Sequence, residues 1–158
     1  DHNNQRSKMH IRNAKESDKE FNKLANREID QASYIEISNL KQNLDSDVFQ
    51  KNKAECLLAV EDNHYLGMVL FSKVYWADRG EGIYVSQVYV SPKFRKRGIF
   101  KKLLKAVYDF DKNTKFVTCL VSKKNQNMID CMHNLGFEDE NMISYVKNKE
   151  DFEKLTFD

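Results

Sequence analysis

The segment over residues 88–100 reads Val88-Tyr89-Val90-Ser91-Pro92-Lys93-Phe94-Arg95-Lys96-Arg97-Gly98-Ile99-Phe100. It opens with β-branched and aromatic residues, which are typical of a strand. Pro92 ends this strand, because a proline has no N–H to donate to a sheet ladder. A basic turn follows, and a helix with apolar residues along one side is expected to begin near Gly98. The stretch therefore predicts a strand, a turn and a helix in direct succession.

The start of this predicted helix favours an anion. The first amides of a helix have no partner inside it and carry the positive end of its dipole. Gly98 has no Cβ, so a phosphate can approach the backbone closely there. Seven basic residues and no acidic one fall within residues 93–105, namely Lys93, Arg95, Lys96, Arg97, Lys101, Lys102 and Lys105. Gly98 alone would indicate only a turn, and Lys102 and Lys105 suit a solvated helix face, but the succession as a whole predicts phosphate binding.

On the N-terminal side of this stretch, the residue pattern predicts four strands and two helices. The strands are expected at 9–13, 54–61, 65–75 and 83–90, and the helices from Ser17 into the late twenties and at 34–44. Residues 61–64 predict a tight turn between two strands. Residues 76–82 contain two glycines and predict a loop.

On the C-terminal side, the helix that begins near Gly98 is followed by a strand at 116–121. Further on, the pattern predicts a helix at 125–135 that Gly136 ends, a strand at 142–146 and a short helix at 150–155. The order is β-α-α-β-β-β-α-β-α-β. The fold class is therefore α/β (α+β), with a mixed, mainly antiparallel sheet flanked by helices and a crossover over residues 83–121.

Length and composition narrow the class of protein. The 158 residues predict a single domain over 9–158, with residues 1–8 as a flexible lead or a cloning remnant. No apolar run reaches the roughly 18 residues that a membrane helix needs. Cys56, Cys119 and Cys131 are odd in number and lack paired spacing, which favours a reducing, cytoplasmic location and argues against a zinc site. The net charge of +2 is too small for a generic polyanion binder.

The segment Arg95-Lys96-Arg97-Gly98-Ile99-Phe100 resembles motif A of the GNAT superfamily of N-acetyltransferases, whose consensus is Arg/Gln-x-x-Gly-x-Gly/Ala. Phe100 departs from it, because the family has a small residue there. Asn125 and Gly136-Phe137 resemble the family's motif B, and Ile11-Arg12-Asn13-Ala14 with Asp18 resembles its usual opening. The resemblance runs from about residue 9 to residue 147, and its order of elements agrees with the order predicted above.

The resemblance implies a GNAT-like fold and a reaction in which an amine attacks the thioester of acetyl-CoA directly. It also implies acetyl-CoA as co-substrate, a primary amine as acceptor, and a homodimer. The cofactor-binding residues that it implies are Val88, Tyr89, Val90, Arg95, Lys96, Arg97, Gly98, Ile99, Phe100, Lys101 and Asn125. Asn125 is equally suited to capping the helix that follows it.

The sequence identifies the catalytic groups less clearly than it identifies the cofactor-binding residues. The family implies that the backbone amide of Val88 stabilises the developing oxyanion. Glu81 is a candidate base through a water molecule, and Asp78 is an alternative. Met132 occupies the position at which many family members carry a tyrosine acid, and methionine cannot donate a proton. The thiolate would then leave unaided or take its proton from another group.

Cys131 is a weaker candidate for a covalent nucleophile. His133 could activate it only from about 200° around the same helix. A buried structural cysteine is the simpler interpretation.

A narrower resemblance, to the diamine and polyamine acetyltransferase branch, rests on Tyr75-Trp76, Gly80 and Gly82-Ile83-Tyr84. That branch usually continues with Glu-Asp in the strand, whereas this chain has Ser86-Gln87. The acidic pair that would favour a polyamine is therefore missing.

Two other functions fit parts of the sequence. The absence of the tyrosine and of the acidic pair would suit a non-catalytic protein that binds or senses acyl-CoA. The basic stretch 93–105, with Phe94 and Phe100 among its cations, would suit a nucleic-acid-binding module that stacks bases on aromatic rings. The small net charge, and the place of Phe100 on the apolar side of its helix, argue against nucleic acid.

Overall fold

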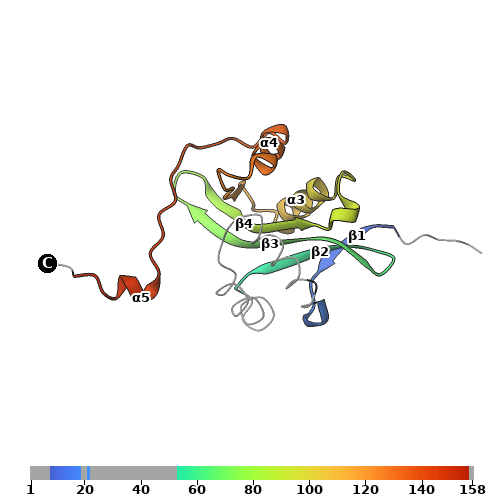
Figure 1. Cartoon of the computed structure of the whole chain (residues 1–158), viewed down its shortest axis with the longest axis horizontal. Helices are drawn as coiled ribbons and strands as arrows, with labels where there is room; N and C mark the ends of the chain where they lie inside the picture. Colours follow the sequence, from blue (N-terminus) through green and yellow to red (C-terminus); the bar gives the residue numbers. More distant parts are fainter. Residues whose placement is uncertain (1–7, 19–20, 22–52, 157–158) are drawn as a thin grey trace, which may run out of the picture. The chain divides into compact units, whose positions relative to one another are not determined.

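The computed structural model describes residues 8–18, 21 and 53–156. These residues form two compact units that divide between Asn125 and Gln126. The first unit contains a five-stranded sheet in the order β1-β2-β3-β4-β5 (Figure 1). Its elements are β1 (His10–Asn13), the 3-10 turn η1 (Glu16–Asp18), β2 (Glu55–Glu61), β3 (His64–Trp76), β4 (Gly80–Val90), the 3-10 turn η3 (Pro92–Phe94), α3 (Ile99–Phe110) and β5 (Phe116–Cys119).

The sheet is mixed and mainly antiparallel. Strands β1 to β4 pair antiparallel in chain order, and β5 pairs with β4 in parallel. Parallel neighbours need a crossover connection, and α3 lies in the one that joins β4 to β5. The predicted sheet type and the helix near Gly98 are thus confirmed. The helices predicted between Ser17 and residue 44 fall almost wholly outside the described residues.

Two tight turns join the long strands. The β2–β3 turn has Asp62 and Asn63 at positive φ (49° and 62°), as a hairpin turn that matches the strand twist requires. The β3–β4 turn is shorter than the loop predicted at 76–82, because both strands continue until Trp76 pairs with Gly80. The two glycines had indicated a loop, but Gly82 serves a different need. A Cβ there would collide with the ring of Phe116, so the glycine makes room for that ring.

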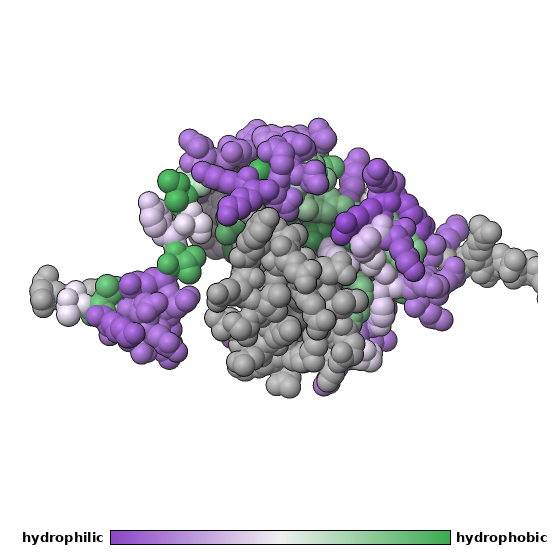
Figure 2. Space-filling view, in the orientation of Figure 1, coloured by the Kyte–Doolittle hydropathy of each residue, from purple (hydrophilic) through white to green (hydrophobic). Residues whose placement is uncertain are grey.

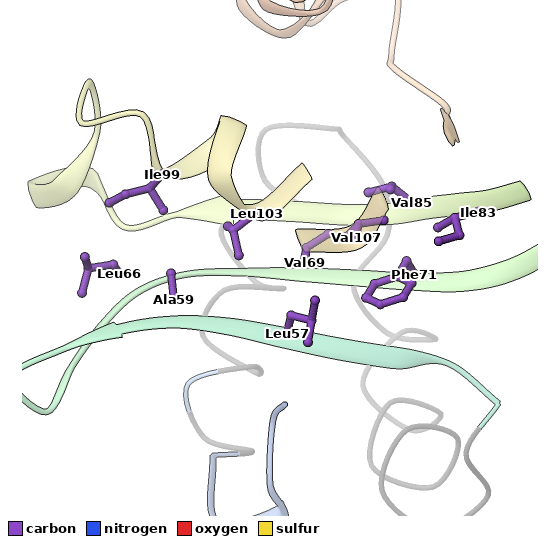
Figure 3. Packing of buried hydrophobic residues seen from close by; sticks show 10 residues of the cluster. All are labelled: Leu57, Ala59, Leu66, Val69, Phe71, Ile83, Val85, Ile99, Leu103 and Val107. Atoms are coloured by element: carbon purple, nitrogen blue, oxygen red, sulfur yellow. The ribbon is translucent and has the colours of Figure 1, made fainter. Parts of the chain in front are cut away.

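One face of the sheet carries the main core, which we call the α3-side cluster (Figure 3). Its buried members are Leu57, Ala59, Leu66, Val69, Phe71, Ile83, Val85, Ile99, Leu103 and Val107. They come from β2, β3, β4 and α3, so burying them fixes the helix against the strands. The lysines of α3 stay exposed, as its amphipathic pattern predicts. Hydrophilic side chains dominate the visible surface of the described residues (Figure 2).

The opposite face carries a second apolar group, which we call the far-side cluster. Its buried members are Cys56, Leu58, Val60, Met68, Leu70 and Tyr89, and Ala14, Phe21, Ala54 and Tyr65 pack against them. Both faces of the sheet are therefore apolar in this unit, which explains the nearly continuous hydrophobic run of β2.

The second unit begins at Gln126 and contains α4 (Gln126–Asn134) and α5 (Lys149–Phe152). Gly136 ends α4 as predicted, at φ 84°. The amide of Phe137 bonds the carbonyl of Met132, and that of Gly136 bonds the carbonyl of His133, which is the Schellman pattern. The short helix predicted in the tail is also present.

The strand predicted at 142–146 is wrong. These residues have no regular structure, and Met142, Ile143, Tyr145 and Val146 are between 72% and 89% exposed. Their β-branched and aromatic character favours a strand, but a strand also needs a neighbour to bond its backbone. None of the strands in the described part of the chain pairs with them.

Candidate functional site

The site is built around an edge of β4 that β5 leaves open. The parallel pairing runs from Gly82 with Phe116 to Val85 with Cys119 and stops there, while β4 continues to Val90. A register shift lies at the same point, because Leu70 pairs with Gln87 and Phe71 pairs with Val85. Ser86 is the extra residue, and its hydroxyl donates to the carbonyl of Leu70 at 3.1 Å. β4 therefore separates from β5 beside a bulge in its pairing with β3.

The backbone groups at this open edge follow from the ladder pattern. The amide of Ser91 donates to the carbonyl of Leu66 at 2.8 Å, so Ser91 is directed toward β3. Residues of an antiparallel strand alternate in direction, so Tyr89 and Gln87 also bond toward β3. Val88 and Val90 then present their N–H and C=O groups to the open edge. The guanidinium of Arg95 donates to the carbonyl of Val90 at 3.0 Å, in agreement with this direction.

The loop beyond β4 leads directly to the start of α3. Lys96 and Gly98 both have positive φ (65° and 74°), and Ile99 begins the helix. The first helical bond runs from the amide of Lys102 to the carbonyl of Gly98 at 3.1 Å. Within the described ranges, the amides of Ile99, Phe100 and Lys101 donate to no backbone acceptor. An αL residue followed by a helical one gathers such amides into an anion-binding concavity.

The basic side chains of this loop differ in how they are held. Arg97 donates to Glu61 at 3.0 Å and lies over the ring of Phe94, at 5.7 Å from its centroid. Arg95 is tied to the backbone of β4, as described above. Lys96, Arg97 and Lys101 are exposed, whereas Ile99 is buried in the core. The predicted loop residues are thus brought together around the exposed Gly98.

The two predicted catalytic groups of the first unit, Val88 and Glu81, are not brought together. Glu81 is exposed at the start of β4, seven residues before Val88, which is about 23 Å along a strand. Asp78 lies in the turn before it. Asn125 ends the first unit, and its amide bonds the carbonyl of Ser122 at 2.9 Å. In the second unit, Met132 is buried, which is typical of a methionine that fills space in the protein interior.

Two titratable groups lie where β4 and β5 separate. Burial raises the pKa of the Cys119 thiol, and burial also raises the pKa of the Tyr84 phenol. Both groups are therefore protonated at neutral pH. Neither had been considered a strong candidate from the sequence alone, and the parallel register of β5 is what places them beside the opening.

Gln87 is the residue whose importance the sequence did not reveal. Its amide oxygen Oε1 is buried, and no hydrogen-bond donor among the described residues reaches it. The sequence offered one signal, a polar side chain within an apolar strand, but this signal does not identify what the side chain binds.

The described residues contain no cluster of three or more His, Cys, Asp or Glu side chains suited to a metal ion. They also contain no helix long and apolar enough to cross a membrane.

Known proteins with the same fold are numerous but distant in sequence. A possible acetyltransferase from Clostridium difficile 630 is 21% identical, with a TM-score of 0.73 over 89% of this chain and 98% of that one. The aminoglycoside N-acetyltransferase AAC(6')-Iy in complex with CoA is 18% identical, with a TM-score of 0.73 over 90% and 96%. Ribosomal-protein-alanine N-acetyltransferase from Brucella melitensis biovar Abortus 2308 is 19% identical, with a TM-score of 0.70 over 89% and 99%. These likenesses show the fold.

The family is shown by a separate comparison. No curated protein matches the chain. The family model described as Acetyltransferase (GNAT) family matches residues 19–137, which is more than half of the 158 residues. The prediction of an acetyltransferase with acetyl-CoA as its co-substrate is confirmed at the level of the family, while the polyamine branch stays a prediction. The chain belongs to the acetyltransferase (GNAT) family.

Proposed function

We propose that this protein transfers the acetyl group of acetyl-CoA to a primary amine, with the cofactor along the open edge of β4. The proposal rests on one observation, which is that two sets of outward-facing backbone groups follow one another directly along the chain. The outward backbone groups of Val88 and Val90 lead directly to the amides at the start of α3. The pantetheine amides would pair with Val88 and Val90, and the pyrophosphate would bind the loop from Arg95 to Lys101.

The chemistry follows from the same edge. The amine nitrogen attacks the thioester carbon, and the amide of Val88 stabilises the negative charge that develops on the carbonyl oxygen. The carbon–sulfur bond then breaks, CoA leaves as a thiolate, and the nitrogen gives up its extra proton to water. A thiol of pKa about 8.5 is a tolerable leaving group without an acid, so Met132 in place of a tyrosine does not prevent the reaction. Glu81 stays a weak candidate for relaying the proton, because of its distance along β4.

The decisive experiment measures acetyl-CoA binding by thermal shift in two matched variants. Gly98→Asn and Gly98→Asp introduce side chains of nearly equal shape at a left-handed position that both tolerate. A Cβ at Gly98 meets no atom of the described residues beyond its chain neighbours within 4 Å, so neither variant is expected to disturb the fold. Saturating acetyl-CoA at about 100 times its dissociation constant should stabilise the wild type by about 2.7 kcal/mol. The Asn variant should keep much of this shift, and the Asp variant should lose it, because its carboxylate repels the phosphates.

The outcomes separate the alternatives. If acetyl-CoA stabilises the wild type and the Asp variant equally, the phosphates bind elsewhere. If acetyl-CoA binds but no amine in a broad panel is acetylated, the chain is an acyl-CoA-binding protein without catalysis. If acetyl-CoA does nothing at millimolar concentration while an oligonucleotide binds in a salt-sensitive way, the basic stretch 93–105 serves nucleic acid.

The proposal includes three broader expectations. The family resemblance supports a homodimer, which sedimentation would test. The odd number of cysteines supports a reducing, cytoplasmic location, and the described cysteines are free thiols. The motif order over residues 9–147 supports a single functional domain over 9–158.

A further inference from the structure

Gln87 lies on the face of the sheet opposite α3. Val85, Val88 and Val90 belong to the α3-side cluster or pack against it. Because Ser86 is the extra residue of the bulge, Gln87 and Tyr89 both lie on the other face, and Tyr89 is a buried member of the far-side cluster there. Gln87 pairs with Leu70, which is also a member of that cluster.

The amide oxygen of Gln87 is in an unusual state for a buried group. Its Oε1 atom is buried and accepts no hydrogen bond from any described residue. Buried side-chain oxygens nearly always have a partner, because desolvating them without one is costly. An acceptor that no described residue pairs, lying beside an open strand edge, is suited to a donor on a bound molecule.

The position of Gln87 relative to the open edge indicates which donor this is. It directly precedes Val88, whose amide faces that edge, and it lies two residues beyond the last β4–β5 pair. The other face beside Val88 is covered by α3, whose Leu103 and Val107 are fully buried against the sheet. A polar molecule that reaches a thioester at Val88 from the face opposite α3 would meet Gln87 directly beside it.

We propose that Gln87 binds the acceptor amine, with its Oε1 atom accepting a hydrogen bond from the attacking nitrogen. This inference rests on the proposed function, because it assumes that the thioester lies at Val88. A glutamine amide is not basic, so Gln87 orients the amine and takes no proton. One N–H of a neutral amine points to Oε1, and the lone pair of the nitrogen is left free to attack.

The neutrality of Gln87 itself bears on the class of acceptor. Its amide oxygen accepts a hydrogen bond but offers no negative charge to an ammonium ion. The carboxylate of Asp18, whose partner Tyr65 packs against the far-side cluster, is already held by Arg12 and is not available to an ammonium ion. The site should favour amines that are substantially neutral near pH 7.5, where about a third of a peptide α-amine is neutral but only about 0.1% of a lysine side chain.

The experiment compares acetylation of two short peptides by the wild type and two variants. One peptide has a free α-amine and no lysine, and the other has a blocked N-terminus and one lysine. Gln87→Leu keeps the size of the side chain and removes the acceptor, while Gln87→Glu keeps the shape and adds a charge. The dissociation constant of acetyl-CoA and the urea midpoint are measured for each protein.

We expect the wild type to use the α-amine peptide more efficiently than the lysine peptide. Gln87→Leu should lower kcat/KM for the α-amine about 10- to 100-fold, with the acetyl-CoA dissociation constant unchanged within about twofold. Its urea midpoint should stay the same or rise, because the unpaired oxygen is gone. A merely structural glutamine would lower the midpoint instead. Gln87→Glu should shift the preference toward lysine, since a carboxylate binds the ammonium form.

The results that overturn the inference are distinct from those that overturn the proposed function. If the wild type acetylates the α-amine and Gln87→Leu does so with the same kcat/KM, Gln87 does not bind the acceptor, and the proposed function stands. If the wild type prefers the lysine peptide, the inferred acceptor class is wrong. If the wild type neither binds acetyl-CoA nor acetylates either peptide, the proposed function fails and this inference fails with it.

Discussion

Arg12 holds Asp18 through two parallel hydrogen bonds, from Nη1 to Oδ2 at 2.9 Å and from Nη2 to Oδ1 at 3.0 Å. The carboxylate also accepts the amide of Lys15 at 2.7 Å and the hydroxyl of Tyr65 at 2.6 Å. Asp18 is only 3% exposed, so these four donors replace its water. These hydrogen bonds connect η1 to β1 and β3, and Tyr65 also packs against the far-side cluster. They make Asp18 a structural residue, and two predictions follow from them.

The first prediction concerns acid stability. The hydrogen bonds from Arg12, with those from Tyr65 and Lys15, hold the pKa of Asp18 well below its usual range, although burial opposes them. A carboxyl group whose folded pKa lies below its unfolded value of about 3.9 stabilises the fold above that value. This contribution should be complete above about pH 5 and should be lost progressively as the pH falls through 4. Urea unfolding between pH 7 and pH 3 measures it.

The second prediction concerns the substitution Asp18→Asn. It removes the charge that Arg12 and the other donors surround, so unfolding at pH 7 should become easier by about 3 kcal/mol. The difference from the wild type should begin to shrink below about pH 4, where the unfolded carboxyl takes up protons, and should persist in part at pH 3, because the folded pKa lies lower still. Asp109→Asn is the matched control, because its pair with Lys105 is exposed and should contribute less than about 0.5 kcal/mol. Equal losses in the two variants would contradict the role given to Asp18.

A third prediction concerns the contact between α3 and the sheet. A Cβ at Gly67 would lie 2.6 Å from the carbonyl oxygen of Tyr89 and 3.3 Å from Cδ1 of Leu103. Gly67→Ala should therefore lower the free energy of unfolding by about 1 to 3 kcal/mol, as overpacking does. Since the nearer atom belongs to the backbone, the additional substitution Leu103→Ala should not remove this penalty.

Gly98→Ala is the comparison variant for Gly67→Ala. It adds the same methyl group at φ 74°, where no described residue beyond the chain neighbours lies within 4 Å of the Cβ, so it should cost only the conformational strain of about 1 to 2 kcal/mol. Urea denaturation of the single and double variants separates the two effects. If Leu103→Ala abolished the cost of Gly67→Ala, the contact with the side chain, and not the carbonyl, would limit the approach of α3.

The central part of the fold could be predicted because several local signals agree there. Pro92 ends β4, the basic turn follows, and the apolar spacing after Gly98 defines α3. Each signal depends on residues within one or two turns of chain, which a single sequence contains. The β2–β3 hairpin was predicted for the same reason. The error at 76–82 arose because a glycine that makes room for Phe116 resembles a glycine that makes a loop.

What could not be predicted depends on partners that are distant in sequence. The apolar residues 142–146 predicted a strand, but pairing decides whether a strand forms, and none of the described strands pairs with them. Gln87 appeared unsuited to catalysis because glutamine is not a base. The bulge at Ser86 and the end of the β5 pairing place its side chain beside the open edge, where its oxygen is buried without a donor among the described residues.

The last prediction uses the ion pair between Glu61 and Arg97. It joins the end of β2 to the proposed phosphate loop, with side chains 29% and 46% exposed, so it should contribute little to stability. For the proposed ligand, however, Glu61 is a competitor, because its carboxylate occupies a guanidinium that a phosphate would use and adds a negative charge beside it. Glu61→Gln should leave the free energy of unfolding within about 0.5 kcal/mol of the wild type and tighten acetyl-CoA binding about two- to fivefold.

Titration calorimetry at low and high salt tests this prediction. The gain from Glu61→Gln should shrink at about 0.5 M salt, because screening weakens the repulsion between exposed charges. Asp109→Asn serves as the control, since it breaks an exposed ion pair on α3 outside the loop and should leave the affinity unchanged. Weaker binding by Glu61→Gln would mean that Glu61 holds Arg97 in the orientation that the phosphate needs. The carboxylate would then be part of the cofactor site and not a competitor of the ligand.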